Sequence, residues 1–256
     1  MTDGDLAARA EDAGLNASAP PQQRWMDGWL MRFSPGKAKR ARCINAVADG
    51  REPLQRKLDQ ARALYARAGL PLMFRITPFA RPATLDGELA ARGLRTLDDT
   101  RVMLLPSLAA VEPPLWARGL RVEAVGHHAF AQAVGQLRGS PLAQRQAHAQ
   151  RLELSPVPFQ GVLLRADGEL LACAQSAVEG ALVGLYDVCT ATPQRGRGYA
   201  LGLCRQLLVE AAAQGARAAY LQVDAANTPA RALYAQKLGF ADAYAYHYRT
   251  DDPEAV

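Results

Sequence analysis

A glycine-bearing loop between a predicted strand and a predicted helix has the residue types of an anion-binding site. The strand ends at Thr190, an amphipathic helical pattern begins at Tyr199, and the connecting segment reads Arg195-Gly196-Arg197-Gly198-Tyr199-Ala200. Such a turn can point consecutive backbone amides outward, and the unpaired amides and positive dipole of the helix start favour an anion. The glycines let a phosphate approach the backbone, and the two arginines add positive charge. The loop predicts a phosphate-binding site, although glycine alone would also fit an ordinary flexible turn.

A second segment downstream accompanies this loop. Asn227-Thr228-Pro229-Ala230 has the composition of a helix start, Leu233-Tyr234 follows inside the helix, and Leu238-Gly239-Phe240 ends it. The two segments match neither the Rossmann fingerprint nor the Walker A loop, because a third glycine at the right place and a Gly-Lys-Ser/Thr run are missing.

Together the two segments resemble the GCN5-related N-acetyltransferases, the GNAT superfamily. The likeness rests on Arg-x-x-Gly-x-Ala in the loop and on Asn-x-x-Ala, Leu-Tyr and Leu-Gly-Phe in the second segment, and it covers residues 121–249. The resemblance implies an α/β fold with a mixed, V-shaped central sheet flanked by helices. It also implies that acetyl-CoA is the co-substrate, held in the split between two neighbouring strands, and that no metal is needed.

The same resemblance assigns roles to individual residues. The backbone of the strand end pairs with the pantetheine arm, through Val188, Cys189 and Thr190. Backbone amides of the loop bind the pyrophosphate, namely those of Arg195, Gly196, Arg197, Gly198, Tyr199 and Ala200. Asn227 hydrogen-bonds the cofactor with Ala230 beside it, and Tyr234 faces the thioester sulfur as general acid, for which its ordinary pKa of ~10 is suited.

The general base is the open part of this mechanism. Where some relatives carry a glutamate early in the strand before the loop, this chain has Gly184. Asp187, which shares a strand face with Cys189 by the two-residue period, is one candidate to act through water, and Glu179 is the other. His127 and His128, which stand before a predicted helix, fit a surface or capping role better than that of a base. His247 alternates with tyrosines along a predicted strand, where it would either line the acceptor cleft or pack.

The order strand, helix, strand, helix, strand occurs twice along the chain. In the first half it is indicated by residues 41–47, 54–65, 72–76, 85–92 and 102–105, and in the second by residues 183–189, 199–214, 219–223, 229–238 and 243–248. Landmarks recur at one offset of 146 residues, as Gly196 does relative to Gly50 and Gly215 relative to Gly69. A repeated architecture follows, with two tandem GNAT-like domains.

The predicted divide lies at Pro113-Pro114, which gives domains 1–112 and 113–256. The first would be degenerate and non-catalytic, with a peripheral extension over residues 1–22, and the second would bind acetyl-CoA and carry the activity. In the first half the loop reads Asp49-Gly50-Arg51-Glu52, with one glycine and two carboxylates that would repel a pyrophosphate. Glu88 stands at the position that matches Tyr234.

Composition places the chain among folded globular proteins. Its 256 residues are 49% hydrophobic and 21% charged, with a net charge of +5 from arginines spread along the chain. The four cysteines form no Cys-x-x-Cys pair and lie in apolar stretches, as expected of buried thiols. Neither a membrane span nor a signal peptide is evident, so we expect a cytoplasmic protein without a membrane partner.

Two functions of other classes compete with the enzyme. A catalytically inactive sensor or regulatory protein that binds acyl-CoA would keep the loop and lack a competent base. A nucleic-acid binder would use Lys37, Lys39, Arg40 and Arg42, but this run lacks clustered aromatics and better fits a solvated face, so no nucleic-acid partner is expected. The expected partners are acetyl-CoA and an amine-bearing small molecule or peptide, while the choice of acceptor and a homodimeric state stay open.

Overall fold

The computed structural model describes residues 3–254 and divides them into two compact units that are discontinuous in sequence. Unit 1 contains residues 3–17, 102–223 and 227–243, and unit 2 contains residues 18–101, 224–226 and 244–254. No helix within residues 3–254 is long and apolar enough to cross a membrane.

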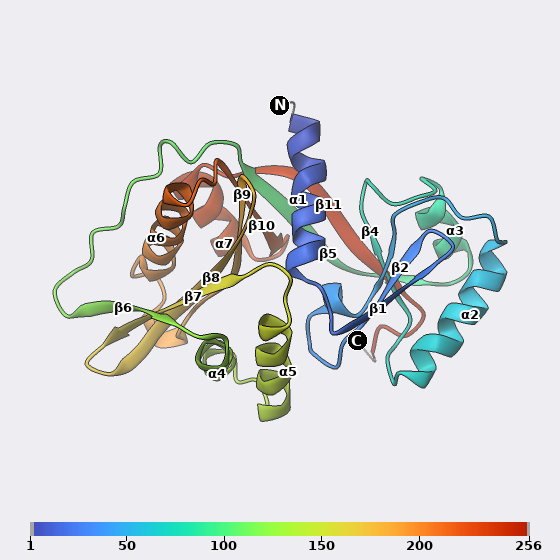
Figure 1. Cartoon of the computed structure of the whole chain (residues 1–256), viewed down its shortest axis with the longest axis horizontal. Helices are drawn as coiled ribbons and strands as arrows, with labels where there is room; N and C mark the ends of the chain where they lie inside the picture. The colour runs from blue at the N-terminus through green and yellow to red at the C-terminus, as the bar shows by residue number, and fades with distance from the viewer. Residues whose placement is uncertain (1–2, 255–256) are drawn as a thin grey trace. The chain divides into compact units, whose positions relative to one another are not determined.

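Unit 1 is built on strands in the hydrogen-bonded order β5-β10-β9-β8-β7-β6 (Figure 1). The strands of this unit are β6 (Leu120–Val125), β7 (Phe159–Ala166), β8 (Glu169–Glu179), β9 (Leu182–Thr190) and β10 (Ala218–Asp224), of which only the last residue of β10 belongs to unit 2. From β6 to β9 each strand pairs antiparallel with the next, whereas β9 and β10 pair in parallel across the helix that connects them. The sheet of this unit is therefore mixed, as expected.

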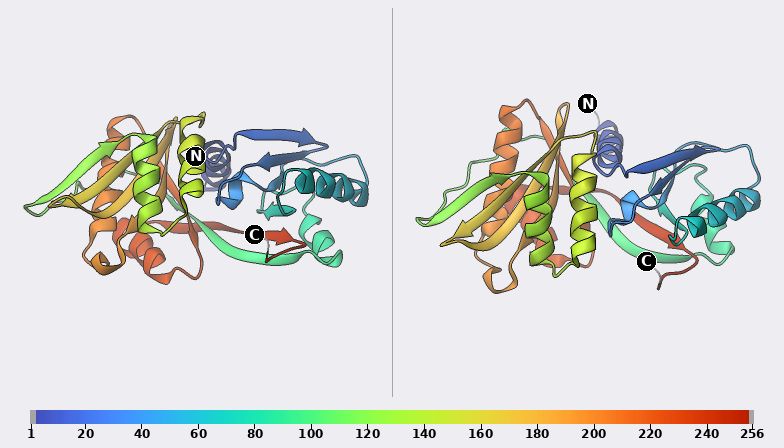
Figure 2. Two further views of the ribbon diagram at one scale, coloured as in Figure 1. Left: turned by 90° about the horizontal axis from the view of Figure 1, so that it is seen from below. Right: turned by 60° about the horizontal axis from the view of Figure 1, so that its bottom comes forward.

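Helices cover both faces of these strands (Figure 2). On one face lie α1 (Asp3–Ala17), α4 (His127–Leu137) and α5 (Leu142–Glu153), which bury Phe130 and Leu152 against Leu163 and Cys173. On the other face α6 (Tyr199–Ala213) and α7 (Thr228–Ala232) pack over the core around Leu207. A five-residue π-helical turn, Leu233–Lys237, continues α7.

Unit 2 repeats the strand-helix pattern on a smaller scale. Its elements are β1 (Gln22–Met26), β2 (Trp29–Phe33), a 3-10 turn (Lys39–Ala41), β3 (Ile44–Ala46), α2 (Leu54–Arg67), β4 (Met73–Ile76) and α3 (Leu85–Ala91). β2 and β3 pair antiparallel, and β3 pairs in parallel with β4. Trp29 and Phe74 meet edge to face, 4.9 Å between ring centroids, in its buried core.

Two further strands are divided between the units. β5 (Arg95–Leu105) contributes residues 95–101 to unit 2 and residues 102–105 to unit 1, and β11 (Ala241–Thr250) is divided at residue 243. β5, which closes the first sequence repeat, is the neighbour of β10 from the second repeat. β11, which closes the second repeat, pairs antiparallel with β4 from the first, with His247 opposite Ile76. The repeats thus exchange their last strands, so the compact units do not coincide with residues 1–112 and 113–256.

Residues 3–17 are not peripheral, contrary to the expectation for residues 1–22, of which residues 1 and 2 lie outside the described part of the chain. α1 belongs to unit 1, where Leu6, Ala10 and Ala13 are buried against Leu182 and Tyr220. The apolar residues at three- and four-residue spacing give the helix one apolar face, but its place depends on strands more than a hundred residues away. The strand β1, which follows it, had no clear sequence pattern and was not expected.

The basic run of unit 2 differs from the solvated face expected for it. Lys39 and Arg40 are half-buried, and the Lys39 ammonium lies 2.9 Å from the Asp98 carboxylate. The Arg40 guanidinium donates to the Tyr246 hydroxyl at 3.2 Å. These two cations therefore make contacts within their own unit.

Candidate functional site

The parallel strands β9 and β10 stay paired along only part of their length. Their register runs from Leu182 opposite Ala218 to Leu185 opposite Leu221 and ends there among the described residues. Beyond that point β9 is still held on its other side by β8, with Cys189 opposite Cys173 and Thr190 opposite Ala172. One edge of residues 188–190 is therefore left without a paired strand, which is the place predicted for the pantetheine arm.

A β-bulge in β9 marks the point where the strands part. Gln175 lies opposite Tyr186 and Cys173 opposite Cys189, so two steps on β8 match three steps on β9. The extra residue falls at Asp187–Val188, and Asp187 has a positive φ of 50°, an uncommon conformation for a residue with a side chain. Bulges of this kind bend a strand and re-aim its groups, which accounts for the end of pairing with β10.

The predicted phosphate loop follows β9 directly and opens onto the start of α6. Gly196 and Gly198 have φ values of 77° and 80°, a conformation that favours glycine, and no atom lies within 4 Å of where a Cβ would stand at either. Gly198 is the N-cap of α6, and no side chain caps that helix, so its first amides keep the free donors of a helix start. Arg195 and Arg197 are exposed beside them. The loop is open, glycine-dependent and positively charged, which fits a pyrophosphate.

Asn227 has a structural role that the sequence pattern also indicates. It is the N-cap of α7, and its side-chain oxygen accepts from the Ala230 amide at 3.2 Å. The oxygen is thus used by the helix, and the side-chain NH₂ group is the part that could donate to a ligand. Ala230 itself is half-buried against the core of unit 1.

Tyr234 lies in the π-helical turn after α7 and is 8% exposed. Its ring packs edge to face with Phe240, and it belongs to the same core as Cys204 of α6. Burial, and then the neighbouring Cys204 thiol, raise the pKa of Tyr234 above its ordinary value. The hydroxyl therefore stays protonated at neutral pH, as a proton donor must, and short π-helical segments are frequent at functional sites.

Asp187 does not lie free as a base would. Its Oδ1 lies 2.7 Å from the Arg138 guanidinium, and its Oδ2 accepts from Gln175 at 2.6 Å and lies 3.3 Å from Nε2 of His148. Burial raises the pKa of this carboxyl, but the hydrogen-bonding His148 and the charge of Arg138 outweigh it and hold the pKa well below its ordinary value. A carboxylate so stabilised is a weak proton acceptor, and this contact pattern favours a positioning role.

The remaining candidates for the general base, Glu179 and three histidines, lie on different elements. The Glu179 carboxylate accepts from the Asn16 side chain at 2.8 Å. His127 begins α4, and His128 beside it is exposed. His247 belongs to unit 2 and lies 2.9 Å from the Asp86 carboxylate.

Gly184 has a packing reason to be glycine. A Cβ there would stand 2.5 Å from the Tyr186 ring and 2.7 Å from the Tyr220 hydroxyl. These two hydroxyls are themselves hydrogen-bonded at 2.6 Å. The space that a glutamate side chain would need is occupied by two tyrosines, so a base must come from another element.

His148 and Arg138 are the residues that sequence reasoning missed. His148 lies on α5, a largely polar helix, and Arg138 is the C-cap residue of α4. Neither stands in a motif, and only the fold brings them to Asp187. Three of the four cysteines are buried as predicted, and Cys189 is half-buried.

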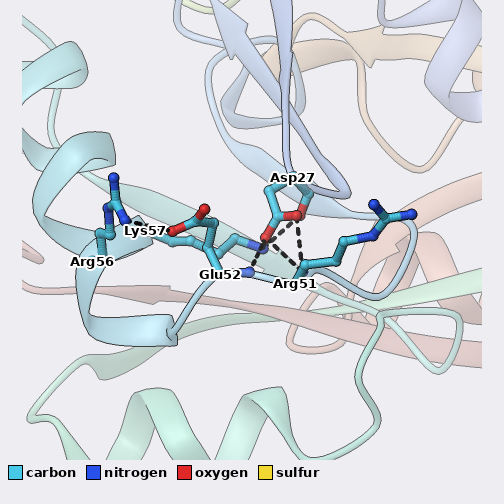
Figure 3. A network of polar contacts seen from close by, with 5 residues as sticks. All are labelled: Asp27, Arg51, Glu52, Arg56 and Lys57. Carbon is cyan, nitrogen blue, oxygen red and sulfur yellow. Dashed lines mark hydrogen bonds and ion pairs between the residues drawn. The ribbon is translucent and has the colours of Figure 1, made fainter.

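The loop of unit 2 that matches the phosphate loop in sequence is occupied by a side chain of the same unit (Figure 3). The Asp27 carboxylate accepts from the backbone amides of Arg51 at 2.9 Å and Glu52 at 3.0 Å, just before α2. The Lys57 ammonium lies 3.2 Å from the same carboxylate. The amide of Arg51 is the largest of the contacts that lower the pKa of Asp27 to about 2.

The glycine of this loop also lacks the open space found in unit 1. A Cβ on Gly50 would stand 2.3 Å from an Asp27 carboxylate oxygen and 2.4 Å from the Lys57 nitrogen. Asp27 reaches this position from the two-residue hairpin turn Asp27-Gly28 between β1 and β2, in which both residues have positive φ. An internal anion thus fills the place where an external one would bind.

Comparison with known proteins agrees with this geometry. Residues 8–249 match the family model described as "Probable histone acetyltransferase Rv0428c C-terminal". A curated relative, "Uncharacterized N-acetyltransferase YobR" of Bacillus subtilis (strain 168), is 28% identical over 230 residues, which are 89% of this chain and 91% of YobR.

Solved structures with the same fold include two GNAT proteins. A GCN5-related N-acetyltransferase from Kribbella flavida superposes with a TM-score of 0.68 at 18% identity, over 96% of both chains. A tandem GNAT protein from the clavulanic acid biosynthesis pathway superposes with a TM-score of 0.64 at 17% identity, over 78% of this chain and 70% of its own. At these identities the likeness shows the fold, which is the expected one.

Proposed function

The chain belongs to the family described as "Probable histone acetyltransferase Rv0428c C-terminal", within the GNAT superfamily of N-acetyltransferases, and on that premise we propose that acetyl-CoA is its acetyl donor and a primary amine its acceptor. The transfer would proceed by direct attack in a ternary complex. The observation that carries the proposal is the open loop of Gly196 and Gly198 at the start of α6, directly after the strand that parts from β10.

Each part of the site would have one task in this reaction. Acetyl-CoA supplies an activated thioester. The amides of residues 195–200 would bind its pyrophosphate, and the free edge of Val188, Cys189 and Thr190 would hold its pantetheine arm. The Asn227 side-chain NH₂ would donate to the cofactor, and the protonated Tyr234 hydroxyl would return a proton to the departing sulfur.

Unit 2 is proposed to bind no acetyl-CoA of its own. The Asp27 carboxylate already accepts hydrogen bonds from the backbone amides that a phosphate would need. Its negative charge also repels a second anion. One molecule of acetyl-CoA per chain is therefore expected.

The test is acetyl-CoA binding by calorimetry to the wild type and to two matched glycine variants. Gly198→Asp puts a side chain and a negative charge into the loop, whereas Gly168→Asp makes the same change in an open turn of unit 1 with a similar φ of 84°. We expect Gly198→Asp to lose binding and Gly168→Asp to keep it within threefold of the wild type. Equal loss in both variants, or no binding by the wild type, would contradict the proposed donor site.

Turnover is tested next by release of free thiol. A lysine-rich peptide of histone-tail sequence is the first acceptor, because the matched family is named for a histone acetyltransferase. Spermidine is the second, as a small primary amine. Binding of acetyl-CoA with no thiol release above solvent hydrolysis for either acceptor would favour an acyl-CoA-binding sensor.

A further inference from the structure

A cluster of polar side chains lies at the bulge of β9 and is not needed to hold acetyl-CoA. Four elements contribute to it: Arg138 from the end of α4, His148 from α5, Gln175 from β8 and Asp187 from β9. All four belong to unit 1. Such convergence of a histidine on a paired carboxylate is the arrangement that orients an imidazole for proton transfer.

The carboxylate at the centre of the cluster is fully engaged. Arg138 donates to Oδ1 and Gln175 donates to Oδ2, while Nε2 of His148 lies 3.3 Å from Oδ2 as an ion-pair contact. Gln175 is 1% exposed, and its own Oε1 has no hydrogen-bond partner within residues 3–254, so its buried amide is oriented by Asp187 alone. The strained backbone of Asp187 is therefore fixed by three side chains, and with it the direction of its carboxylate.

Only one of the two ring nitrogens of His148 lies at the Asp187 carboxylate. Nε2 faces Asp187 at 3.3 Å, and the ring packs edge to face with Phe130, 6.5 Å between centroids. Because an anion favours the N–H on the nearer nitrogen, the proton belongs on Nε2 and the lone pair on Nδ1. The His148 side chain is 18% exposed, so a small group can reach it.

The cluster lies at the residue where transfer would occur. Asp187 immediately precedes Val188, at the point where β9 loses its pairing with β10. A base bound to Asp187 thus stands next to the strand segment proposed to hold the pantetheine arm. Gly184, the strand position that could otherwise supply a carboxylate, is closed by Tyr186 and Tyr220.

We infer that His148 is the general base of the acetyl transfer and that Asp187 is its positioning residue. This inference rests on the proposed function. The acceptor nitrogen forms its bond to the carbonyl carbon as the carbon–sulfur bond breaks. Its proton goes to Nδ1 of His148, and the departing sulfur takes the proton of the Tyr234 hydroxyl. Exchange with water then returns a proton from His148 to Tyr234, so the sum is an amide and free coenzyme A.

The charges around His148 are consistent with this role. The Asp187 carboxylate lies at the ring of His148, and the charges of Arg138 and Arg151 both act on that carboxylate. Cys173 and Cys189 lie near the same carboxylate and guanidinium.

The first measurement is steady-state kinetics of His148→Gln with the lysine-rich peptide and with spermidine. General base catalysis contributes about 10²–10⁴-fold, so we expect kcat to fall by about 10²-fold or more while the Kd for acetyl-CoA stays within threefold. The matched control is His128→Gln, since His128 is exposed on α4 and has no part in the cluster. Imidazole added to His148→Ala should restore part of the rate. A His148→Gln variant with wild-type kcat would overturn the inference, whereas absent acetyl-CoA binding in the wild type would overturn the proposed function.

A second measurement does not depend on turnover. Long-range ¹H–¹⁵N spectra of the full chain at pH 8.5 report which ring nitrogen of His148 carries the proton. We expect the proton on Nε2 in the wild type and a mixture of tautomers in Asp187→Asn, with thermal midpoints recorded for both. A proton on Nδ1 in the wild type would refute the pairing of His148 with Asp187, and with it the assigned base.

Discussion

Separating the two sequence repeats is predicted to unfold both, because each repeat supplies a strand to the core of the other. The perturbation is expression of residues 113–256 alone. This fragment lacks α1 and β5, and so loses five large side chains that are at most 9% exposed in unit 1: Leu6, Val102, Met103, Leu104 and Leu105.

The magnitude follows from burial. Each such side chain contributes about 1.5–3 kcal/mol, so the fragment forgoes about 7–15 kcal/mol. A whole domain is stable by only about 5–15 kcal/mol, so even half of that loss would leave the fragment largely unfolded. In addition, β10 would lose its hydrogen-bonded neighbour β5 and become an edge strand.

The assay is near-ultraviolet circular dichroism and thermal unfolding of three samples. The samples are the fragment 113–256, the fragment co-expressed with residues 1–112, and the full chain carrying a protease site between residues 112 and 113 that is cut after folding. We expect no cooperative transition for the fragment alone and near-native transitions for the other two. A monomeric fragment 113–256 with a cooperative transition close to that of the full chain would refute the strand exchange as a requirement for folding.

Three further predictions concern the sites. Tyr234→Phe should lower kcat by about 10²-fold or more in the thiol-release assay with the Kd for acetyl-CoA within threefold, because the raised pKa of Tyr234 keeps the hydroxyl protonated; unchanged kcat would rule out the acid role. Calorimetry should give one acetyl-CoA per chain, and a stoichiometry of two would show that Asp27 does not close the loop of unit 2. The pKa of Asp27 is lowered to about 2 in the fold, against about 3.9 when the chain is unfolded. Its ionised form therefore stabilises the fold above pH 4, and this contribution is lost as the pH falls through 2. Urea midpoints of wild type and Asp27→Asn should therefore differ constantly from pH 5 to 7 and converge toward pH 2; a difference that persists at pH 2 would be inconsistent with this titration.

Local chemistry let the sequence predict the loop and helix geometry of the proposed donor site. A left-handed backbone strongly favours glycine, so Gly196 and Gly198 mark the loop without any knowledge of the fold. Asn227 caps its helix by a hydrogen bond to the amide three residues later, and such a local contact can be predicted from the sequence pattern. Strand and helix patterns likewise predicted β9, α6, β10 and β11, since side-chain periodicity reflects burial on one face.

Long-range pairing could not be predicted in this way. The exchange of β5 and β11 joins strands from different repeats. The residue pattern of a strand indicates which of its faces is buried, but it does not indicate which strand will pair with it. The packing of α1 in unit 1 could not be predicted for the same reason, because an apolar helix face does not indicate which surface it will cover. The internal carboxylate of Asp27 depends on a hairpin turn that lies 24 residues before the amides it meets.

The assignment of the base shows the difference most directly. The sequence predicted Asp187 as a candidate base, and the structure places it at the bulge of β9. Only the tertiary structure brings Arg138, His148 and Gln175 to that carboxylate and shows that it is already paired. Residue type and spacing determine what a local segment can bind, whereas the proton chemistry of a side chain is set by charges that the fold brings from distant segments.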